Sequence, residues 1–241
     1  MKAKLISYSQ TPDHLEDLDS ALDLIAYCAR VSNPDNQNNK ETSEKLVKYL
    51  MKHKHWSPLE MVSACLEIET TRDIARQILR HRSFSFQEFS QRYADPTKDL
   101  DFELREARLQ DPKNRQNSIA LDMSDEYEGG LQDRWCQMQE RVINESKLAY
   151  NWAINNGIAK EQARAVLPEG NTVSRMYVNG TLRSWVHYIE LRGANGTQQE
   201  HIEIAHAVAK VISDIFPMHD MLGTAPPPPG IPKISEYDDR F

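Results

Sequence analysis

The chain has 241 residues, of which 39% are hydrophobic and 27% charged, and its formal net charge at pH 7 is -7. This composition is typical of a globular protein whose core needs no disulfide or metal, and the acidic balance argues against broad binding to nucleic acid or anionic membranes. The length is compatible with a single domain over residues 1–241. The three cysteines have no CxxC spacing, and the sequence has no long apolar run and no signal peptide, which predicts a protein of the reducing cytoplasm.

Hydrophobic periodicity predicts alternating strands and helices in the first third of the chain. Residues 2–9 alternate as a strand does, and Leu22, Ile25, Ala26 and Ala29 recur at helical spacing. The polar run NPDNQNN predicts a loop between two helices. In order, the expected elements are a strand at 2–9, helices at 18–32 and 42–56, a strand at 60–71 and a helix at 70–79.

The rest of the chain is predicted to begin with a flexible insertion at 94–130, because this region is charged and weakly periodic, with some helix around 102–110. No GxGxxG or GxxxxGK occurs, so a Rossmann or P-loop site is not expected. The elements predict one α+β domain, with a mixed β-sheet flanked by helices. The elements expected after the insertion are a helix at 131–156 stopped by Gly157, a short helix at 158–168, a strand at 171–179, and helices at 181–192 and 198–216. A proline-rich and acidic tail is expected at 225–241.

An apolar stripe follows the helix predicted at 131–156, the longest helical stretch in the chain. A stripe of this kind predicts either a core face or a subunit interface. Its members are Trp135, Met138, Val142, Leu148 and Trp152.

A dense cluster of polar groups, RHRSFSFQEFSQRY, follows the helix at 70–79. Arg72, Arg76 and Arg80 recur every four residues on that helix, and like charges at this spacing repel one another. We therefore expect an anionic partner beside them. Ordinary surface salt bridges are the alternative for Arg72 and Arg76, and Asp73 could pair with Arg76 or Gln77 at helical spacing.

Two other patterns near this cluster have structural interpretations. The three phenylalanines of the segment are interpreted as core residues, whereas the role of Tyr93 stays open. His53 and His55 are two residues apart, which places them on different faces of a helix, and no third ligand is near in sequence. We therefore expect no metal site.

Four segments together resemble the flavin-dependent thymidylate synthases. The family motif RHRxxSxNExSxRY is matched by RHRSFSFQEFSQRY, with Gln87 in place of the usual Asn. HWSPLE is similar to the HxxPxE segment of the family, with Met61 where His is frequent. ARAVLP resembles RxxLP, and NGTLRSWVHYIELR resembles the C-terminal nucleotide-binding segment, with His187 where several members carry Asn. The resemblance extends from Val31 to Phe216.

This resemblance implies reductive methylation of dUMP to dTMP, with 5,10-methylenetetrahydrofolate as the one-carbon donor, NADPH as the reductant and FAD as the redox carrier. It also implies a homotetramer with active sites at subunit interfaces, whose partners are dUMP and folate and include neither nucleic acid nor membrane. Thymidylate synthases of the other, non-flavin type use a cysteine followed by His. No cysteine here has that neighbour, which favours chemistry without an enzyme thiolate.

The same resemblance assigns roles to individual residues. It assigns catalysis to Arg192 and His55, and Arg192 would stabilise negative charge on the uracil ring. The residues implied for dUMP binding are Gln77, Arg80, Glu88, Phe89, Ser90, Gln91, Arg92, Arg164 and Arg192. Those implied for FAD binding are Ser57, Arg80, His81, Arg82, Glu88, Thr181, Leu182, Arg183 and His187.

Two alternative functions stay open at this point. A nucleic-acid-binding module could be built on RHR with its interleaved aromatic residues, although the net charge of -7 and the spread of the matching motifs argue against it. A nucleotide-binding relative without turnover is the second alternative, because Gln87, Met61 and His187 depart from the family pattern.

Overall fold

The sheet at the centre of the structure is antiparallel throughout. The computed structural model describes residues 1–15 and 18–216, so the predicted tail at 225–241 lies outside the described residues. The strand order is β1-β2-β6-β3, and each neighbouring pair is antiparallel. The strands are β1 (Lys2–Tyr8), β2 (Ser63–Thr71), β6 (Val173–Thr181) and β3 (Ser85–Glu88).

The α+β prediction is confirmed, but the expectation of a mixed sheet is wrong. Strands β2 and β6 pair along their whole length, from Ser63 opposite Thr181 to Thr71 opposite Val173, although α5 and several other elements separate them in sequence. So long a connection allows the second strand to enter the sheet in either direction. Hydrophobic periodicity reports which face of a strand is buried and carries no information about its direction.

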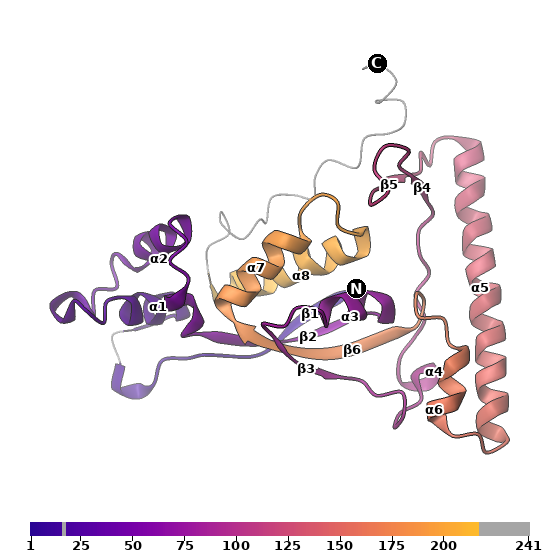
Figure 1. Ribbon diagram of the computed structural model, residues 1–241, viewed down its shortest axis with the longest axis horizontal. Coiled ribbons are helices and arrows are strands. Elements are labelled where there is room, and N and C mark those ends of the chain that lie inside the picture. Colours follow the sequence, from indigo (N-terminus) through magenta and orange to yellow (C-terminus); the bar gives the residue numbers. More distant parts are fainter. Residues whose placement is uncertain (16–17, 217–241) are drawn as a thin grey trace.

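Five helices surround this sheet. Helices α7 and α8 cover one face, while α1 and α2 lie together at one end (Figure 1). The helix predicted at 198–216 is confirmed as α8, and its Val208 and Ile212 side chains are fully buried. Trp185 fixes α7 to the sheet by donating from Nε1 to the carbonyl oxygen of Ala64 over 3.0 Å. The helices are α1 (Ala21–Ala29), α2 (Ser43–Lys52), α3 (Arg72–Ile78), α7 (Leu182–Arg192) and α8 (Gln199–Ile215), and the 3-10 helices are η1 (Asp13–Leu15), η2 (Pro34–Asn36), η3 (Ser57–Glu60) and η4 (Arg164–Val166).

The aromatic residues of the RHR segment divide between core and surface. Phe84 is buried, and a Cβ built on Gly180 would lie 2.3 Å from its Cδ1, so the ring occupies space that only glycine leaves free. Phe86 is partly buried and packs against the same core, and Phe89 is half-buried. The core interpretation is thus confirmed for Phe84 and Phe86. Tyr93 is 79% exposed.

The insertion at 94–130 contains little regular structure. The helix expected around 102–110 is wrong, because this segment is extended and ends in a hairpin. Gln139 binds both the backbone N–H and the carbonyl oxygen of Arg105, which removes those groups from helical hydrogen bonding. The elements of the insertion are α4 (Pro96–Asp99), β4 (Arg108–Gln110) and β5 (Ser118–Ala120).

Helix α5 (Glu126–Asn155) begins inside the segment predicted to be insertion, five residues before the predicted start at 131. Its N-cap is Asp125, whose side chain accepts a hydrogen bond from the backbone N–H of Glu128 over 3.0 Å. The pair of glycines in DEYEGG favoured a break there, but the cap and the following helix outweigh their low propensity. Gly157 follows the end of α5 with φ 78, as predicted, and α6 (Lys160–Ala163) comes next.

The apolar stripe of α5 is exposed in this chain. Leu148 is 64% exposed and Trp152 is 63% exposed. The buried side of α5 instead carries Tyr150 and Ala153, which pack against Ala163 and Leu167 around α6 and η4. In Figure 1 the helix stands apart from the sheet. Of the two interpretations of the stripe, a core face within one chain is therefore excluded.

Candidate functional site

The arginines before the RHR segment find their anionic partner within the protein. Helix α3 ends at Ile78, so Arg80 lies beyond it and is not on one helical face with Arg72 and Arg76, which corrects the predicted row of three. Arg76 forms a hydrogen-bonded ion pair with Oε2 of Glu88, and Nη1 of Arg72 lies 3.7 Å from Oε1 of the same carboxylate. Arg72 and Arg76 therefore form salt bridges within the chain, which was the alternative interpretation. Their shared partner is Glu88 of strand β3, and Asp73 instead pairs with Arg105.

Glu88 is held on both oxygens. Its Oε1 also accepts a hydrogen bond from the hydroxyl of Ser174 over 2.8 Å, and the side chain is only 16% exposed. Burial lowers the pKa of the Arg72 guanidinium, and the nearby charge of Arg76 lowers it further, so the carboxylate offsets part of an unfavourable environment. Glu88 thus fixes α3 against β3 and β6.

A second interaction joins the RHR segment to the end of α7. Arg192 donates from Nε to Nε2 of His81 over 2.9 Å. Because Nε2 accepts this bond, the proton of the neutral imidazole sits on Nδ1. Burial and the charge of Arg192 lower the pKa of His81 to about 4, so the ring is neutral at pH 7. Two residues predicted for catalysis and cofactor binding are therefore in direct contact.

Behind this pair lies a chain of hydrogen bonds that links three helices. The hydroxyl of Tyr188 in α7 lies 3.1 Å from Nε2 of His201 in α8, and Nδ1 of His201 lies 3.2 Å from Oε1 of Gln77 in α3. Nε2 of Gln77 donates to Oε1 of Gln198 over 2.8 Å. The His81 ring meets Tyr188 edge-on at 5.1 Å. The predicted nucleotide ligand Gln77 is thus connected to the Arg192 region.

Part of the set predicted to bind the flavin lies in or beside η3 and α7, namely Ser57, Thr181, Leu182, Arg183 and His187. Glu60 pairs with Nη1 of Arg183 over 2.6 Å, and the Trp56 ring meets the His187 ring edge-on at 4.5 Å. Ser57 opens η3 between these two contacts. The HWSPLE segment and the C-terminal segment, which are distant in sequence, therefore form one surface.

The start of α7 is fixed by its cap. The side chain of Thr181 accepts a hydrogen bond from the backbone N–H of Ser184 over 3.4 Å, and Leu182 is buried, with its N–H donating to the Val62 carbonyl over 2.9 Å. Ser184 also donates from its hydroxyl to the carbonyl of Ser83 in the RHR segment over 3.2 Å. Leu182 can offer a ligand only backbone groups, whereas the hydroxyl of Thr181 is half-buried at the surface.

The other predicted nucleotide ligands lie beside α6. Arg92 pairs with Glu161 over 3.3 Å, where both side chains are about half exposed. Ser90 accepts a weak hydrogen bond from the Arg92 N–H at 3.4 Å. Gln91 is buried, and among the described residues its Nε2 has no hydrogen-bond partner. Phe89 continues the edge of the sheet, since its N–H donates to the Arg175 carbonyl over 2.8 Å.

His55, the second predicted catalytic residue, is exposed in the turn after α2. The preceding Lys54 has a φ of 59, and the His55 ring lies 6.3 Å from the rings of Tyr49 and His53. Within residues 1–15 and 18–216, no hydrogen bond or ion pair joins the His55 side chain to Arg192. This chain alone does not bring the two predicted catalytic residues together.

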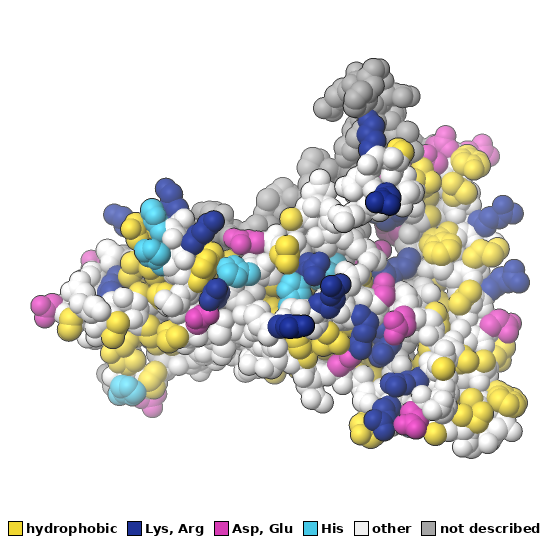
Figure 2. Space-filling model, in the orientation of Figure 1, with side chains coloured by type: hydrophobic (Ala, Val, Ile, Leu, Met, Phe, Trp, Pro, Cys, Tyr) yellow, Lys and Arg dark blue, Asp and Glu magenta, His cyan; other side chains and the backbone are white. Residues whose placement is uncertain are grey.

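Besides Arg192, three arginines of the predicted site have no anionic partner in the described part of the chain. Arg80 and Arg82 are exposed, and Arg164 is half-buried and close enough to Arg72 to lower the pKa of that residue. Figure 2 shows Lys and Arg side chains gathered in a band over α3 and β6 toward α6, with His beside it. Although the net charge of the chain is -7, these guanidinium groups are available for charge-assisted hydrogen bonds to an anion.

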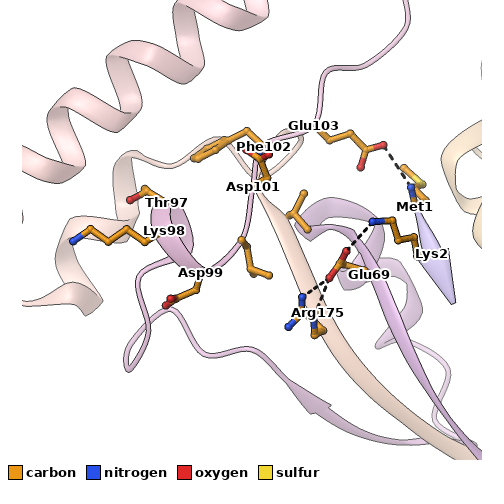
Figure 3. A pocket seen from close by; sticks show the side chains of 12 residues that line it. Met1, Lys2, Glu69, Thr97, Lys98, Asp99, Asp101, Phe102, Glu103 and Arg175 are labelled. Atoms are coloured by element: carbon orange, nitrogen blue, oxygen red, sulfur yellow. Dashed lines mark hydrogen bonds and ion pairs between the residues drawn. The ribbon is translucent and has the colours of Figure 1, made fainter. Parts of the chain in front are cut away.

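Two cavities lie away from these residues. One of about 730 Å³ is enclosed by the insertion, the first turns of α5 and the start of α8. Another of about 600 Å³ lies at the N-terminus, where Glu69 pairs with Lys2 and Arg175 (Figure 3). None of the predicted site residues lines either cavity. Arg80 and Arg82 are instead exposed on the surface, whereas Gln91 and Leu182 are buried.

Sequence reasoning missed Glu60, Tyr188 and His201 as members of this region. Glu60 was quoted only as part of HWSPLE, although a carboxylate five residues after His55 is an available partner for a nearby arginine. His201 belongs to an amphipathic helix whose apolar stripe dominates the pattern. Periodicity places His201 and Tyr188 on helix faces that point toward the core. Because buried polar groups need hydrogen-bond partners, these two positions could have been recognised from the sequence.

The family described as thymidylate synthase complementing protein matches residues 14–218 of this chain. A protein named as a probable flavin-dependent thymidylate synthase of Paramecium bursaria Chlorella virus 1 is 48% identical over 217 residues, which cover 90% of this chain and 96% of the relative. This chain belongs to the flavin-dependent thymidylate synthases.

A second relative agrees with this placement, and a solved structure agrees with the fold. The enzyme of Synechocystis sp. is 50% identical over 194 residues, covering 80% of this chain and 85% of the relative. A crystal structure of a UMP/dUMP methylase from Streptomyces cacaoi, bound with 5-Br dUMP, superposes with a TM-score of 0.70 over 89% of this chain and 90% of that one. At 23% identity, this second likeness supports the fold alone.

Proposed function

We propose that this flavin-dependent thymidylate synthase carries out the reductive methylation of dUMP to dTMP, with 5,10-methylenetetrahydrofolate as the one-carbon donor, NADPH as the reductant and FAD as the redox cofactor. The observation that carries the proposal is the Arg192–His81 contact. One predicted catalytic residue and one predicted cofactor ligand meet there, on a face that also presents the unpaired Arg80 and Arg82.

Arg192 would stabilise the negative charge that develops on the uracil ring. His81 occupies only Nε of the guanidinium, and in the described residues no carboxylate pairs with Nη1 or Nη2. The adjoining His81 and His201 are neutral at pH 7, because burial lowers their pKa values to about 4 and about 3. The positive charge of Arg192 is therefore not neutralised by its neighbours and is available to the ring, whose C5 becomes nucleophilic without an enzyme thiolate.

The remaining guanidinium and hydroxyl groups would hold the phosphate and the sugar of dUMP. Arg80 and Arg164 have no anionic partner among the described residues, and Arg92 is engaged only by an exposed pair with Glu161 that a phosphate can displace. Bidentate bonds from arginine to phosphate are strong and directional. The proposed dUMP ligands are Gln77, Arg80, Ser90, Gln91, Arg92, Arg164 and Arg192, with Glu88 and Phe89 supporting the loop that carries Ser90.

The surface between η3 and α7 fits a cofactor that has both an aromatic ring and phosphates. When bound, FAD supplies the transfer of reducing equivalents from NADPH to the one-carbon unit. The chain offers cationic and hydroxyl donors for its phosphates and ribose, and half-buried rings of Trp56 and His187 beside them. The proposed FAD ligands are Ser57, Arg80, His81, Arg82, Glu88, Thr181, Leu182, Arg183 and His187, with His55 next to them.

A homotetramer with shared active sites agrees with two features of the chain. The apolar stripe of α5 is exposed, as a subunit interface would be before association. In addition, no hydrogen bond or ion pair within the described residues joins His55, Ser90, Arg92 or Arg164 to the Arg192–His81 pair. A site assembled from several subunits accounts for both. We also propose a cytoplasmic location; in the described part of the chain no helix is long and apolar enough to cross a membrane.

The direct test of the cofactor and the substrate is the absorbance of the purified protein between about 350 and 500 nm during anaerobic addition of NADPH. We expect flavin bands that bleach faster when dUMP is present. A colourless protein that cannot take up FAD would refute the proposal. Flavin and dUMP binding without any turnover would instead identify a nucleotide-binding relative that has lost activity.

A further inference from the structure

We infer that His201, held by Tyr188, is a positioning residue that sets the orientation of the Gln77 amide toward the nucleotide. The inference rests on the proposed function, since it takes Gln77 as a dUMP ligand. It concerns two residues, His201 and Tyr188, that no motif of the family assigned to the site.

The hydrogen-bonding pattern has only one direction that satisfies every buried group. His201 is fully buried in α8, and the proton of its neutral ring sits on one nitrogen. The Tyr188 hydroxyl proton has no other acceptor in the described part of the chain, so it is donated to Nε2 of His201 over 3.1 Å. The ring proton is then on Nδ1, which donates to Oε1 of Gln77 over 3.2 Å.

The Gln77 amide is fixed from its nitrogen side as well. Its Nε2 donates to Oε1 of Gln198 over 2.8 Å. If the amide were turned over, its nitrogen would face Nδ1 of His201, and the ring would have to move its proton to Nε2. The buried Tyr188 hydroxyl would then lose its acceptor, and such unsatisfied groups are unfavourable. His201 therefore selects one of the two amide orientations.

This orientation leaves defined groups for a ligand. A glutamine amide has two N–H donors and two acceptor lone pairs, and the chain uses one of each. Gln77 is half-buried and retains one N–H and one lone pair. A ligand that presents an acceptor beside a donor, such as the edge of a uracil ring or a ribose hydroxyl, matches this pair. In the other amide orientation, the N–H of Gln77 would face the donor of that ligand and the carbonyl oxygen would face its acceptor.

The position of these hydrogen-bonded side chains explains why their arrangement is rigid. They come from α3, α7 and α8, which pack on the same core. His81 contacts the Tyr188 ring from the other side, at 5.1 Å. The positioning chain therefore lies directly behind the Arg192–His81 pair, and it joins Gln77 to the same helix α7 that carries Arg192.

The test compares dUMP affinity, flavin content and turnover in the flavin-loaded tetramer. Tyr188→Phe keeps the ring but removes the donor that fixes the His201 tautomer, and we expect dUMP affinity to fall about fivefold, the worth of one hydrogen bond. His201→Gln should raise the KM for dUMP at least as much, whereas His201→Asn, which can offer an amide N–H near the Nδ1 position, should recover part of the loss. Flavin content should stay unchanged. His206→Asn is the matched control, because His206 lies on the same helix but is not part of the hydrogen-bonded series from Tyr188 to Gln77.

A double-mutant cycle separates positioning from general damage to the fold. In a Gln77→Ala background, Tyr188→Phe and His201→Gln should have no further effect on dUMP affinity, because the amide that they orient is gone. Additive losses in that background, or variants with wild-type affinity, would overturn the positioning role while leaving the proposed function intact. A flavin-loaded wild-type protein that does not bind dUMP would overturn both.

Discussion

Arg192 at the end of α7 donates from Nε to Nε2 of His81 over 2.9 Å, and this contact joins the C-terminal segment of the chain to the RHR motif. Within the described residues, no carboxylate pairs with the outer nitrogens of the guanidinium. The bond to His81 also requires a neutral imidazole, because only an unprotonated Nε2 can accept. The pair therefore combines a fixed orientation with a charge that its neighbours do not neutralise.

Arg192→Ala should abolish dTMP formation, with a loss of about a hundredfold or more, because it removes the positive charge at the ring. Arg192→Lys keeps the charge but loses the planar fork, and we expect an intermediate rate. Flavin absorbance measured on each purified variant should match that of the wild type. Turnover retained in Arg192→Ala would refute the assigned role.

Protonation of the buried histidines should make the protein less stable at mildly acidic pH. Burial and Arg192 lower the pKa of His81 from 6.5 to about 4, and burial first and then Arg192 lower that of His201 to about 3. Below pH 6.5 the unfolded chain binds protons at these positions that the folded chain does not, so the free energy of unfolding decreases as the pH falls from 6.5 toward 4.

Urea unfolding between pH 7 and 5 checks this dependence in a range above the ordinary carboxylate pKa values. His201→Asn should show a shallower slope of stability against pH than the wild type, since one of the two depressed groups is absent. A slope that is unchanged in this variant, or stability that rises as the pH falls, would contradict the assignment.

Glu88→Gln should destabilise the fold by about 2 kcal/mol, because it removes the carboxylate that Arg72 and Arg76 share and leaves Arg72 with the 3.8 Å pair to the exposed Glu169. The matched control is Glu161→Gln, which removes the exposed partner of Arg92 and should cost less than about 1 kcal/mol. Urea denaturation of both variants measures the difference. Equal effects would mean that Glu88 does not act as a buried counterion.

Leu148→Glu should weaken the association of subunits, because it introduces a charge into the exposed apolar stripe of α5. Light scattering of the purified protein should give the mass of a tetramer for the wild type and a lower mass for the variant. Asn151→Asp, which adds the same charge at an exposed polar position of the same helix, should leave the mass unchanged. A wild-type protein that is monomeric at micromolar concentration would exclude the shared site.

The sequence predicted most of the elements because their periodic patterns are strong. The stripe of the last helix and the alternation in β2 both point toward the core, as the burial of Val208 and Leu66 confirms. Strand direction was not predictable, since β2 and β6 meet across a long connection. The start of α5 was missed because Asp125 caps the helix before two glycines that favour a break.

Within the candidate site, the motifs assigned roles to individual residues but gave no information about their contacts. The repulsion between Arg72 and Arg76 correctly required an anion, yet the sequence offered no means of recognising Glu88 as that partner, because it lies on a separate strand. The contact between His81 and Arg192 joins positions 111 residues apart. Such pairings depend on how α3 and α7 each pack against the sheet, which no local pattern encodes.

Formation of dTMP from dUMP by the purified protein tests the central claim most directly. The assay contains 5,10-methylenetetrahydrofolate and NADPH, and it is run on protein stripped of flavin and on the same protein after FAD is restored. We predict dTMP only when FAD, the folate and NADPH are all present, and none from the Arg192→Ala variant. Absence of dTMP from the complete mixture, with flavin and dUMP both bound, would contradict the proposed reaction.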